Sequence, residues 1–275
     1  MSKKSILITG CSSGIGYYCA KKLHEEGYRV FATARKAEDV AKLQNEGLES
    51  FLLDLNDSAS IQNAVSEVEK KTNGQLYALF NNGAYGQPGA VEDLSRDVLK
   101  AQFETNLFGT HELTTAILPI MRRQKEGRII QNSSVLGFIS LRFRGAYNAS
   151  KYALEGLSDT LRLELMGTNI YVSLIEPGPI RSAFRKNALQ KFLENIDSKH
   201  STFKEEYVKK LEALQSDEDA PFTLGEDAVY QALLHALESE RPKERYRVTK
   251  PTSWFWFSKR LLSTHLLDKI LRKVE

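Results

Sequence analysis

The stretch Thr9-Gly10-Cys11-Ser12-Ser13-Gly14-Ile15-Gly16 joins a short apolar run, Ser5–Thr9, to an amphipathic run, Ile15–Glu26. The first run has the pattern of a β-strand and the second that of an α-helix. A glycine after a strand permits a tight turn, and glycines at a helix start let the backbone approach a phosphate, which the helix dipole then favours. The spacing predicts a nucleotide-binding turn, with a plain strand–helix connection as the alternative. Its candidate cofactor contacts are Gly10, Ser12, Ser13, Gly14, Ile15 and Gly16.

Short apolar or β-branched runs alternate with longer amphipathic runs along the 275-residue chain. The predicted strands are Ser5–Thr9, Arg29–Ala34, Glu49–Asp54, Leu76–Asn81, Arg128–Ser133, Asn169–Glu176 and Tyr246–Val248. The clearest helical runs are Ile15–Glu26, Ser58–Lys71 and Tyr147–Met166. Most strands are apolar on both faces, as in a parallel sheet that helices cover on both sides. We therefore predict an α/β fold: a single-domain, doubly wound parallel sheet with helices on both faces.

Two segments depart from this alternation. Residues 181–221 are charged and weakly amphipathic without a strand, which is typical of a lid or binding loop. Residues 250–275 form a basic tail, in which an aromatic run, residues 254–257, precedes a helical pattern of Leu262, Leu266, Ile270 and Val274. Such a basic amphipathic helix either packs on its own domain or a sister subunit, or lies on an anionic membrane surface. We predict a main domain over residues 1–249, with the lid at about 181–221, and an amphipathic tail over 250–275.

Composition excludes several classes of protein. A formal charge of +3 with scattered basic residues argues against a nucleic-acid partner. The two cysteines, Cys11 and Cys19, form neither a disulfide framework nor a metal-ligand spacing, and the five histidines are dispersed. The first residues lead directly into a strand without a secretory leader, and no run reaches the roughly 18 apolar residues of a membrane span. We expect a cytoplasmic protein without a metal site, which is membrane-peripheral if the tail binds lipid.

The ends of the second and third predicted strands indicate which dinucleotide the protein binds. Phe31-Ala32-Thr33-Ala34-Arg35 carries no acidic residue that could bind a ribose 2′-hydroxyl. The planar guanidinium of Arg35 instead matches a 2′-phosphate, which predicts NADP(H); a solvated surface arginine is the alternative. Asp54, at the end of the third strand, is placed either to hydrogen-bond the adenine or to cap the turn that follows.

Tyr147-Asn148-Ala149-Ser150-Lys151 places a phenol and an ammonium four residues apart, on one face of a helix. An ammonium beside a phenol lowers the phenol pKa from its usual value of about 10, which makes Tyr147 a usable acid and base. Ser133 and Ser134 end the preceding strand, where neighbouring side chains face opposite ways, so only one of them can point toward the site. Its spacing to Tyr147 makes Ser134 the candidate.

These motifs occur in order with three others. They are Asn81-Asn82-Gly83-Ala84, Asn106 and Pro177-Gly178-Pro179-Ile180. Together they resemble the short-chain dehydrogenase/reductase family over roughly Ser5 to Ile180. The resemblance implies a Rossmann-type fold, a nicotinamide cofactor and the transfer of a hydride between that cofactor and a carbonyl or alcohol carbon.

The resemblance also implies four catalytic roles. Tyr147 would exchange a proton with the substrate oxygen, and Lys151 would lower the pKa of Tyr147 and bind the nicotinamide ribose. Ser134 would hydrogen-bond the substrate oxygen. Asn106 would hold a water that links Lys151 to solvent.

The same resemblance extends the cofactor site. It implies further contacts from Arg35, Asp54, Asn82, Tyr147, Lys151, Pro177, Gly178 and Ile180. One departure concerns the loop after the fourth strand, where the family usually has Asn-Asn-Ala-Gly and this chain has Asn81-Asn82-Gly83-Ala84. Because glycine and alanine differ in their allowed backbone angles, the exchange puts the approach of this loop to the cofactor in question.

The resemblance narrows further to the hydroxysteroid and retinol dehydrogenase branch and to bacterial NADP-dependent aldehyde reductases. It implies a homo-oligomer and an NADPH-dependent reductase of apolar aldehydes or ketones. The alternatives are a hydroxysteroid- or retinol-type alcohol dehydrogenase, and a non-catalytic NADP-sensing protein of the membrane surface. Apolar side chains after the fifth strand either line the substrate pocket or pack on the core. They are Val135, Leu136, Phe138, Ile139, Leu141 and Phe143.

Overall fold

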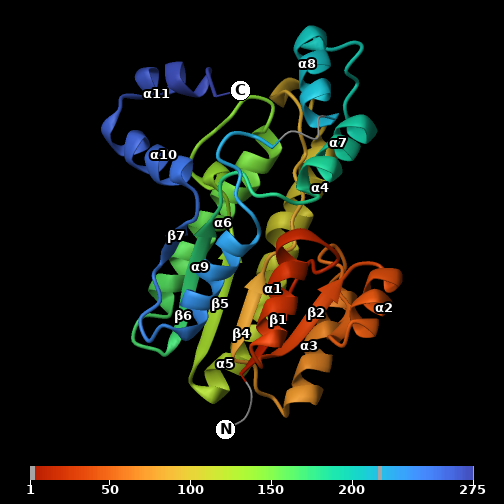
Figure 1. The fold of residues 1–275 in the computed structure, drawn as a ribbon, viewed down its shortest axis with the longest axis vertical. Helices are drawn as coiled ribbons and strands as arrows, with labels where there is room; N and C mark the ends of the chain where they lie inside the picture. Colours follow the sequence, from red (N-terminus) through yellow and green to blue (C-terminus); the bar gives the residue numbers. More distant parts are fainter. Residues whose placement is uncertain (1–3, 216–218, 275) are drawn as a thin grey trace.

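The computed structural model describes residues 4–215 and 219–274, so residues 1–3, 216–218 and 275 of the predicted main domain, lid and tail lie outside the described part. The described residues form one sheet of seven parallel strands in the order β3-β2-β1-β4-β5-β6-β7 (Figure 1). The strands are β1 (Ser5–Ile8), β2 (Arg29–Ala34), β3 (Glu49–Leu52), β4 (Ala78–Asn81), β5 (Gly127–Asn132), β6 (Ile170–Glu176) and β7 (Arg245–Arg247). This confirms the predicted doubly wound sheet.

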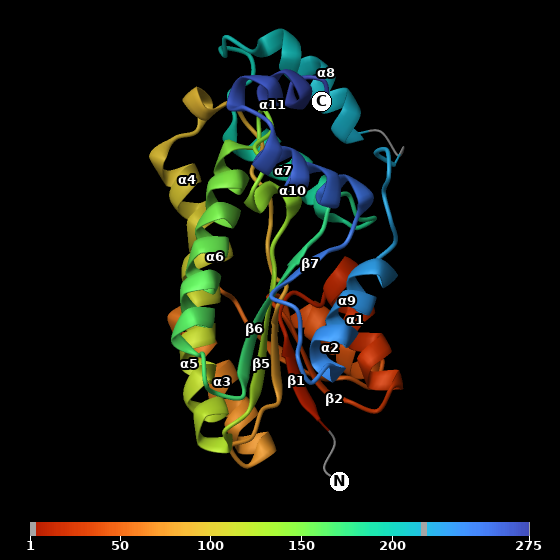
Figure 2. The ribbon, with the colours of Figure 1, turned by 90° about the vertical axis from the view of Figure 1, so that its left-hand side faces the viewer.

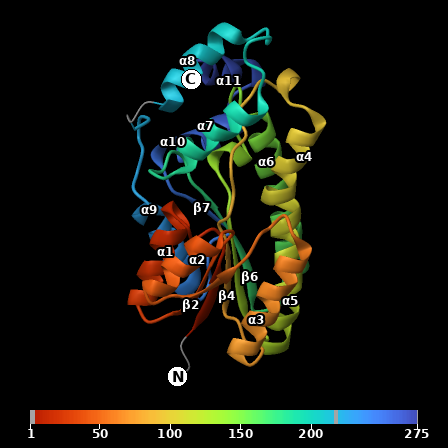
Figure 3. The same ribbon diagram turned by 90° about the vertical axis from the view of Figure 1, so that its right-hand side faces the viewer.

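Helices cover both faces of the sheet (Figures 2 and 3). The sheet is flanked by α1 (Gly14–Glu25), α2 (Ala37–Asn45) and α9 (Asp227–Glu238) on one face, and by α3 (Ser58–Thr72), α5 (Gly109–Gln124) and α6 (Gly145–Glu164) on the other. A shorter helix, α4 (Arg96–Phe103), precedes α5. On β1, Ile6 and Ile8 pack toward α1 and α9, whereas Leu7 packs toward α3 and α5. This alternation explains why the strand is apolar on both faces.

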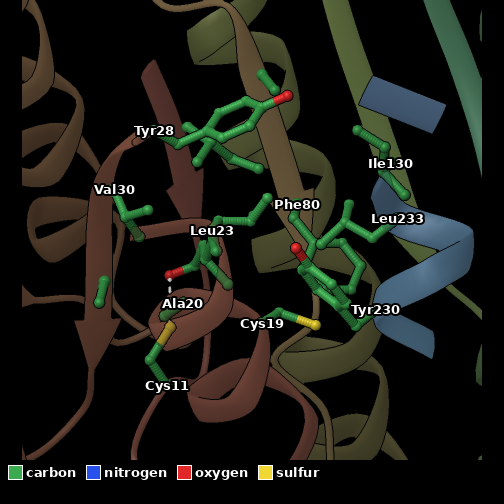
Figure 4. Close-up of a cluster of buried hydrophobic side chains, with 14 of the residues drawn as sticks. Cys11, Cys19, Ala20, Leu23, Tyr28, Val30, Phe80, Ile130, Tyr230 and Leu233 are labelled. Carbon is green, nitrogen blue, oxygen red and sulfur yellow. Dashed lines mark hydrogen bonds between the residues drawn. The ribbon is translucent and has the colours of Figure 1, made fainter. Parts of the chain in front are cut away.

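The strand order reverses at β1, which has β2 on one side and β4 on the other. In open α/β sheets a ligand binds at such a reversal, beyond the carboxyl ends of the strands. The turn after β1 starts at this point. Cys11 and Cys19 lie beneath it in the core with Tyr230 and Leu233 (Figure 4). Burial raises the pKa of the Cys11 thiol to about 12, so this cysteine stays protonated and is a packing residue rather than a nucleophile.

The predicted lid contains two helices that the weak amphipathic pattern did not indicate. They are α7 (Phe184–Asn195) and α8 (Lys204–Gln215). Phe192 and Tyr207 of these helices pack on each other and against Phe143, which forms a small core separate from that of the sheet. Backbone amide Ala90 N donates to the Tyr207 hydroxyl over 2.7 Å, which fastens α8 to the loop after β4.

The tail also differs from the predicted single helix behind an aromatic run. The aromatic residues lie inside a helix, α10 (Lys250–Leu261), and a second helix, α11 (Thr264–Leu271), follows a break at Leu262 and Ser263. The break arises because both residues have extended backbone angles. Figures 1 and 2 show α10 and α11 at the same end of the molecule as α7 and α8, opposite the start of β1.

Candidate active site

The turn after β1 has the geometry of a phosphate cradle. Gly10 and Gly14 have φ values of 70° and 57°, which favour glycine. Ser13 is the N-cap of α1, but its side chain makes no capping hydrogen bond, and the first turn of the helix holds no acidic residue. Ser12 and Ser13 are exposed. The backbone amides at the start of α1 are therefore available to an anion, which fits the pyrophosphate of a dinucleotide.

Asn82 braces this cradle. Its Nδ2 donates to the carbonyl oxygens of Thr9 (3.0 Å) and Gly10 (3.3 Å), and its Oδ1 accepts from Asn132 Nδ2 (2.9 Å). These bonds join the ends of three neighbouring strands, β1, β4 and β5. The structure thus gives Asn82 a positioning role, which the cofactor-contact prediction alone did not include.

The Gly83-Ala84 departure leaves the close approach of this loop intact. A Cβ built at Gly10 would lie 2.9 Å from the Cα of Gly83, and Gly83 N donates to Thr9 Oγ1 over 2.7 Å. Ala84 is not among the described residues with positive φ, so alanine fits there without strain. The exchange therefore does not distort the cradle.

Arg35 and Asp54 lie at the ends of β2 and β3. Arg35 is exposed, and its charge lowers the pKa of Tyr85 against the larger effect of burial, which raises it. Asp54 accepts a hydrogen bond from Asn56 N (2.9 Å) in a local turn. Asp54 therefore caps this turn, as the capping alternative predicts, whereas the N-cap of α3 itself is Asp57, which accepts from Ala59 N. The predicted contact of Asp54 with adenine stays a prediction.

Ser134, Tyr147 and Lys151 come together just beyond the carboxyl end of β5. The side chain of Ser134 is hydrogen-bonded to that of Tyr147. Lys151 Nζ lies 5.7 Å from the centre of the Tyr147 ring and donates to the carbonyl oxygen of Asn132 over 2.7 Å. All three side chains are buried. The Ser133 side chain lies elsewhere, near Gly137 and the Glu155 carboxylate of α6. A Cβ built at Gly137 would lie 2.8 Å from Ser133 Oγ and 3.1 Å from Glu155 Oε1.

The pKa of Tyr147 is shifted upward, to about 12, rather than downward as the neighbouring ammonium predicts. Burial is the largest cause, and the Ser134 hydrogen bond and the charge of Arg144 only partly oppose it. Lys151 directs its ammonium to the Asn132 carbonyl instead of the phenol oxygen. Tyr147 consequently keeps its proton at neutral pH, which is the form that a proton donor needs.

Glu155 extends the buried stripe of α6 by one further turn beyond Lys151. Burial lowers the pKa of Lys151 to about 8, while the charge of Glu155 raises it. Glu155 Oε2 pairs with Arg245 Nη2 of β7 at 3.0 Å, and Arg245 Nε lies 3.5 Å from Glu176 Oε1. Sequence analysis missed this carboxylate, although its four-residue spacing from Lys151 repeats that of Lys151 from Tyr147.

Asn106 lies in a π-helical turn, η2 (Glu104–Phe108), between α4 and α5. Such turns occur frequently at functional sites. Its Nδ2 donates to Tyr85 O (2.9 Å) and Ser150 Oγ (3.2 Å), and its Oδ1 accepts from Tyr85 N (3.2 Å). Asn106 therefore links the loop after β4 to the residue that precedes Lys151. The water that it is expected to hold stays a prediction.

The motif after β6, residues 177–180, contacts three other segments of the chain. Pro177 O accepts from Val135 N (2.8 Å), which ties the motif to the loop after Ser134. A Cβ at Gly178 would overlap Thr249 Oγ1 at the start of α10. Ile180 forms an isolated parallel bridge to the segment before α9. These contacts tie the motif to the loop after Ser134, to the start of α10 and to the segment before α9.

The start of the lid passes over both halves of the site. A Cβ at Gly14 would lie 3.1 Å from the Cβ of Ser182. The ring of Phe184 packs edge-on against Tyr147, with 5.3 Å between ring centres, and a Cβ at Gly86 would lie 2.6 Å from its Cζ. Residues 182–184 thus run from the phosphate cradle to the phenol.

The apolar run after β5 is divided between two neighbours. Val135, Phe138 and Ile139 pack against the tail helices α10 and α11. Phe143 packs against Tyr207 of α8, with 5.5 Å between ring centres. Ile139 and Phe143 therefore follow the packing alternative rather than lining an open pocket.

Comparison with known proteins agrees with this geometry. Residues 4–192 match the family model for short chain dehydrogenases. The uncharacterized oxidoreductase YbbO of Escherichia coli K12 is 44% identical over 277 residues, which cover 98% of this chain and 94% of YbbO. Human 17-beta-hydroxysteroid dehydrogenase type 1 is 33% identical over 263 residues, covering 91% of this chain and 79% of the human protein.

Among solved structures, a short-chain dehydrogenase from Streptomyces avermitilis superposes with a TM-score of 0.76 at 27% identity. The match covers 100% of this chain and 95% of that one. Fold, motif order and sequence identity lead to one conclusion: the chain belongs to the short-chain dehydrogenase/reductase family of oxidoreductases.

Proposed function

We propose that this protein is an NADPH-dependent reductase of apolar aldehydes and ketones. The observation that carries the proposal is the buried cluster of Ser134, Tyr147 and Lys151, which faces the same end of the sheet as the glycine cradle. NADPH would supply the hydride to the carbonyl carbon. The cradle fits that cofactor because its glycines leave no room for a Cβ where the backbone must approach a pyrophosphate.

The residues of the cluster have different roles in the reaction. Tyr147 holds its proton at neutral pH and donates it to the carbonyl oxygen as the hydride arrives. The Ser134 hydroxyl, hydrogen-bonded to Tyr147, stabilises the charge that develops on the same oxygen. Lys151, as an ammonium, binds the cofactor ribose and returns a proton to the phenol. Asn106 holds the water through which Lys151 exchanges protons with solvent.

Aromatic side chains around the site favour an apolar substrate. Phe184 lies on the Tyr147 ring, and the half-buried Tyr85 lies in the loop that Asn106 holds. The cluster of Phe143, Phe192 and Tyr207 stands behind the lid. A hydroxysteroid- or retinol-type alcohol dehydrogenase is the second candidate function, because the same residues run the reaction in reverse by removing the alcohol proton. The raised pKa of Tyr147 keeps this residue in the protonated form with which reduction starts.

The chain is also proposed to form a homo-oligomer through α5 and α6. Exposed apolar side chains lie on η2 next to α5, on α6 and just after α6; they are Phe108, Leu157, Leu163 and Met166. Large apolar side chains exposed on neighbouring elements are a feature of subunit contacts.

Arg35 is expected to set the cofactor preference. We expect Arg35→Asp to raise the KM for NADPH by about 10- to 100-fold, because a charge-assisted pair with the 2′-phosphate is replaced by repulsion. The KM for NADH should fall, since the new carboxylate can accept from a 2′-hydroxyl. The measurement follows absorbance of both cofactors over a panel of aldehydes, ketones and alcohols. Lys70→Asp, which makes the same charge change on the exposed side of α3, should leave both constants unchanged. An unaltered NADPH preference in Arg35→Asp would show that another residue reads the phosphate.

The alkaline limit of reduction is expected to follow Lys151. Because its pKa is about 8, kcat/KM for reduction should fall as pH rises through that value and the ammonium loses its proton. Glu155→Gln removes the carboxylate that raises this pKa, so the falling limb should move to lower pH. Glu164→Gln, at the exposed end of the same helix, is the control. If the falling limb stays in place or moves to higher pH in Glu155→Gln, deprotonation of Lys151 is not the cause of the alkaline limit. Thermal melting of each variant checks that the loss of the Arg245 pair has not unfolded the protein.

A further inference from the structure

The helix α10 packs on its domain through one face and exposes large apolar side chains on another. Thr252, Phe255 and Ser258 are buried, and Phe255 packs in a cluster with Ile139. Three large side chains on the other face are exposed. They are Trp254, Phe257 and Leu261, which are 50%, 55% and 80% exposed. Their spacing of three and four residues aligns them in one stripe along the helix, named here the outer stripe.

The second tail helix repeats this arrangement on a smaller scale. Leu267 of α11 is buried in the same cluster as Phe255, with Ile270 packed beside it. Leu266 of α11 and Val274, three residues after the end of the helix, are exposed. The tail is therefore fixed to its own domain through one side and presents apolar side chains on the other.

Charge decides between the occupants that such a surface could take. Six basic residues fall within 250–275 against two acidic ones, Asp268 and Glu275. The basic residues are Lys250, Lys259, Arg260, Lys269, Arg272 and Lys273. A symmetric contact with a second copy would bring these like charges together, because the same patch meets itself across a two-fold axis. An anionic lipid headgroup supplies the opposite charge, and lipid chains supply the apolar partner.

Two cations, Arg260 of the tail and Arg247 of β7, stack on Trp256, whose ring packs against Phe257 of the outer stripe. The guanidinium of Arg260 lies 3.6 Å from the ring centre of Trp256, and that of Arg247 lies 4.1 Å from it. Stacking of this kind fixes a cation next to an aromatic ring. Tryptophan and basic side chains together are the residue types that anchor a helix at the headgroup level of a bilayer.

We propose that α10 and α11 form a peripheral membrane-docking surface, in which the outer stripe enters the headgroup boundary of an anionic bilayer. Within the described residues, no helix is long and apolar enough to cross a membrane. The tail packs against Val135 and Phe138, which follow Ser134 in the chain, and it lies at the lid end of the molecule (Figures 1 and 2). Docking would hold the lid end of the molecule, with the candidate active site, near the lipid in which apolar carbonyl compounds dissolve. The docking itself does not depend on the proposed reaction.

The test is flotation of the full-length protein with vesicles of phosphatidylcholine alone and of phosphatidylcholine with phosphatidylglycerol. We expect binding to the anionic vesicles that weakens with added salt, and little binding to phosphatidylcholine alone. The combined variant Trp254→Ser, Phe257→Ser and Leu261→Ser should bind the anionic vesicles at least about tenfold more weakly. The variant keeps Thr252, Phe255 and Ser258 of the packed face, and NADPH binding and thermal melting check that the loss of the Trp254 contact with Phe255 has not altered the fold. Val91→Ser with Leu99→Ser, which removes exposed apolar side chains outside both the tail and the proposed subunit contact, should bind like the wild type.

Tryptophan emission and sedimentation velocity test the same surface independently of flotation. In Trp256→Phe, Trp254 is the only tryptophan, and its emission should shift to the blue when anionic vesicles are added. Unchanged emission, or equal flotation of the wild type and the combined variant, would overturn the proposal. Sedimentation velocity provides the other measurement. A wild-type oligomer that dissociates in the combined variant while vesicle binding is absent from both would make the outer stripe a subunit contact instead.

Discussion

Tyr147→Phe is expected to lower kcat for carbonyl reduction by about 10²- to 10⁴-fold, the usual contribution of a positioned proton donor. The phenol is buried, hydrogen-bonded to Ser134 and kept protonated by its raised pKa, so phenylalanine removes the proton while it preserves the ring and its contact with Phe184. The KM for NADPH should change little, because the cradle and Lys151 are unaltered and phenylalanine keeps the aromatic ring of Tyr147. Stopped-flow or steady-state loss of NADPH absorbance gives the rate, and fluorescence titration gives the binding.

Tyr152→Phe is the matched control for this variant. Tyr152 lies on the same helix, but its hydroxyl accepts from Lys259 Nζ (3.1 Å) at the protein surface. Loss of the Tyr152 hydroxyl should leave turnover unchanged. Turnover by Tyr147→Phe at the wild-type rate would mean that another group supplies the proton, and the roles assigned to Ser134 and Lys151 would then also lose their basis.

The strands were predictable from sequence because their burial on both faces leaves few alternatives. Ile6, Leu7 and Ile8 are fully buried against different helices, so the run had to be apolar throughout. The meeting of Ser134 with Tyr147 was predictable for a related reason. A strand end and the following helix confine both side chains to one edge of a parallel sheet, and alternation along a strand separates Ser133 from Ser134.

Other features of the site depend on contacts that no local pattern contains. Asn82 braces the cradle through Thr9 and Asn132, which are 73 and 50 residues away in sequence. The direction of the Tyr147 pKa shift depends on how completely the fold excludes water and on where Lys151 places its ammonium. The helices of the lid are stabilised by tertiary packing between Phe143, Phe192 and Tyr207 rather than by an amphipathic repeat, so their charged sequences resembled a loop.

Gly16→Ala is expected to weaken NADPH binding by at least about 100-fold, which corresponds to roughly 2.7 kcal/mol. A Cβ at this position would overlap the carbonyl oxygen of Gly10 and lie 2.6 Å from Asn82 Nδ2. Neither neighbour can yield cheaply, because one is backbone and the other is held by three hydrogen bonds. The turn must therefore open, and its amides then no longer converge on the pyrophosphate. Isothermal titration with NADPH measures the loss.

Gly156→Ala separates this steric effect from the general effect of replacing a glycine in a helix. Gly156 lies on the exposed face of α6, and a Cβ there would meet nothing within 4 Å. Alanine at that position should raise the free energy of unfolding by about 0.5–1 kcal/mol and leave NADPH binding unchanged, because alanine loses less backbone entropy on folding. If Gly16→Ala folds and binds NADPH as tightly as the wild type does, the cofactor does not rest on this turn. The cradle would then be a packing feature, and the anion-binding role read from residues 9–16 would be wrong.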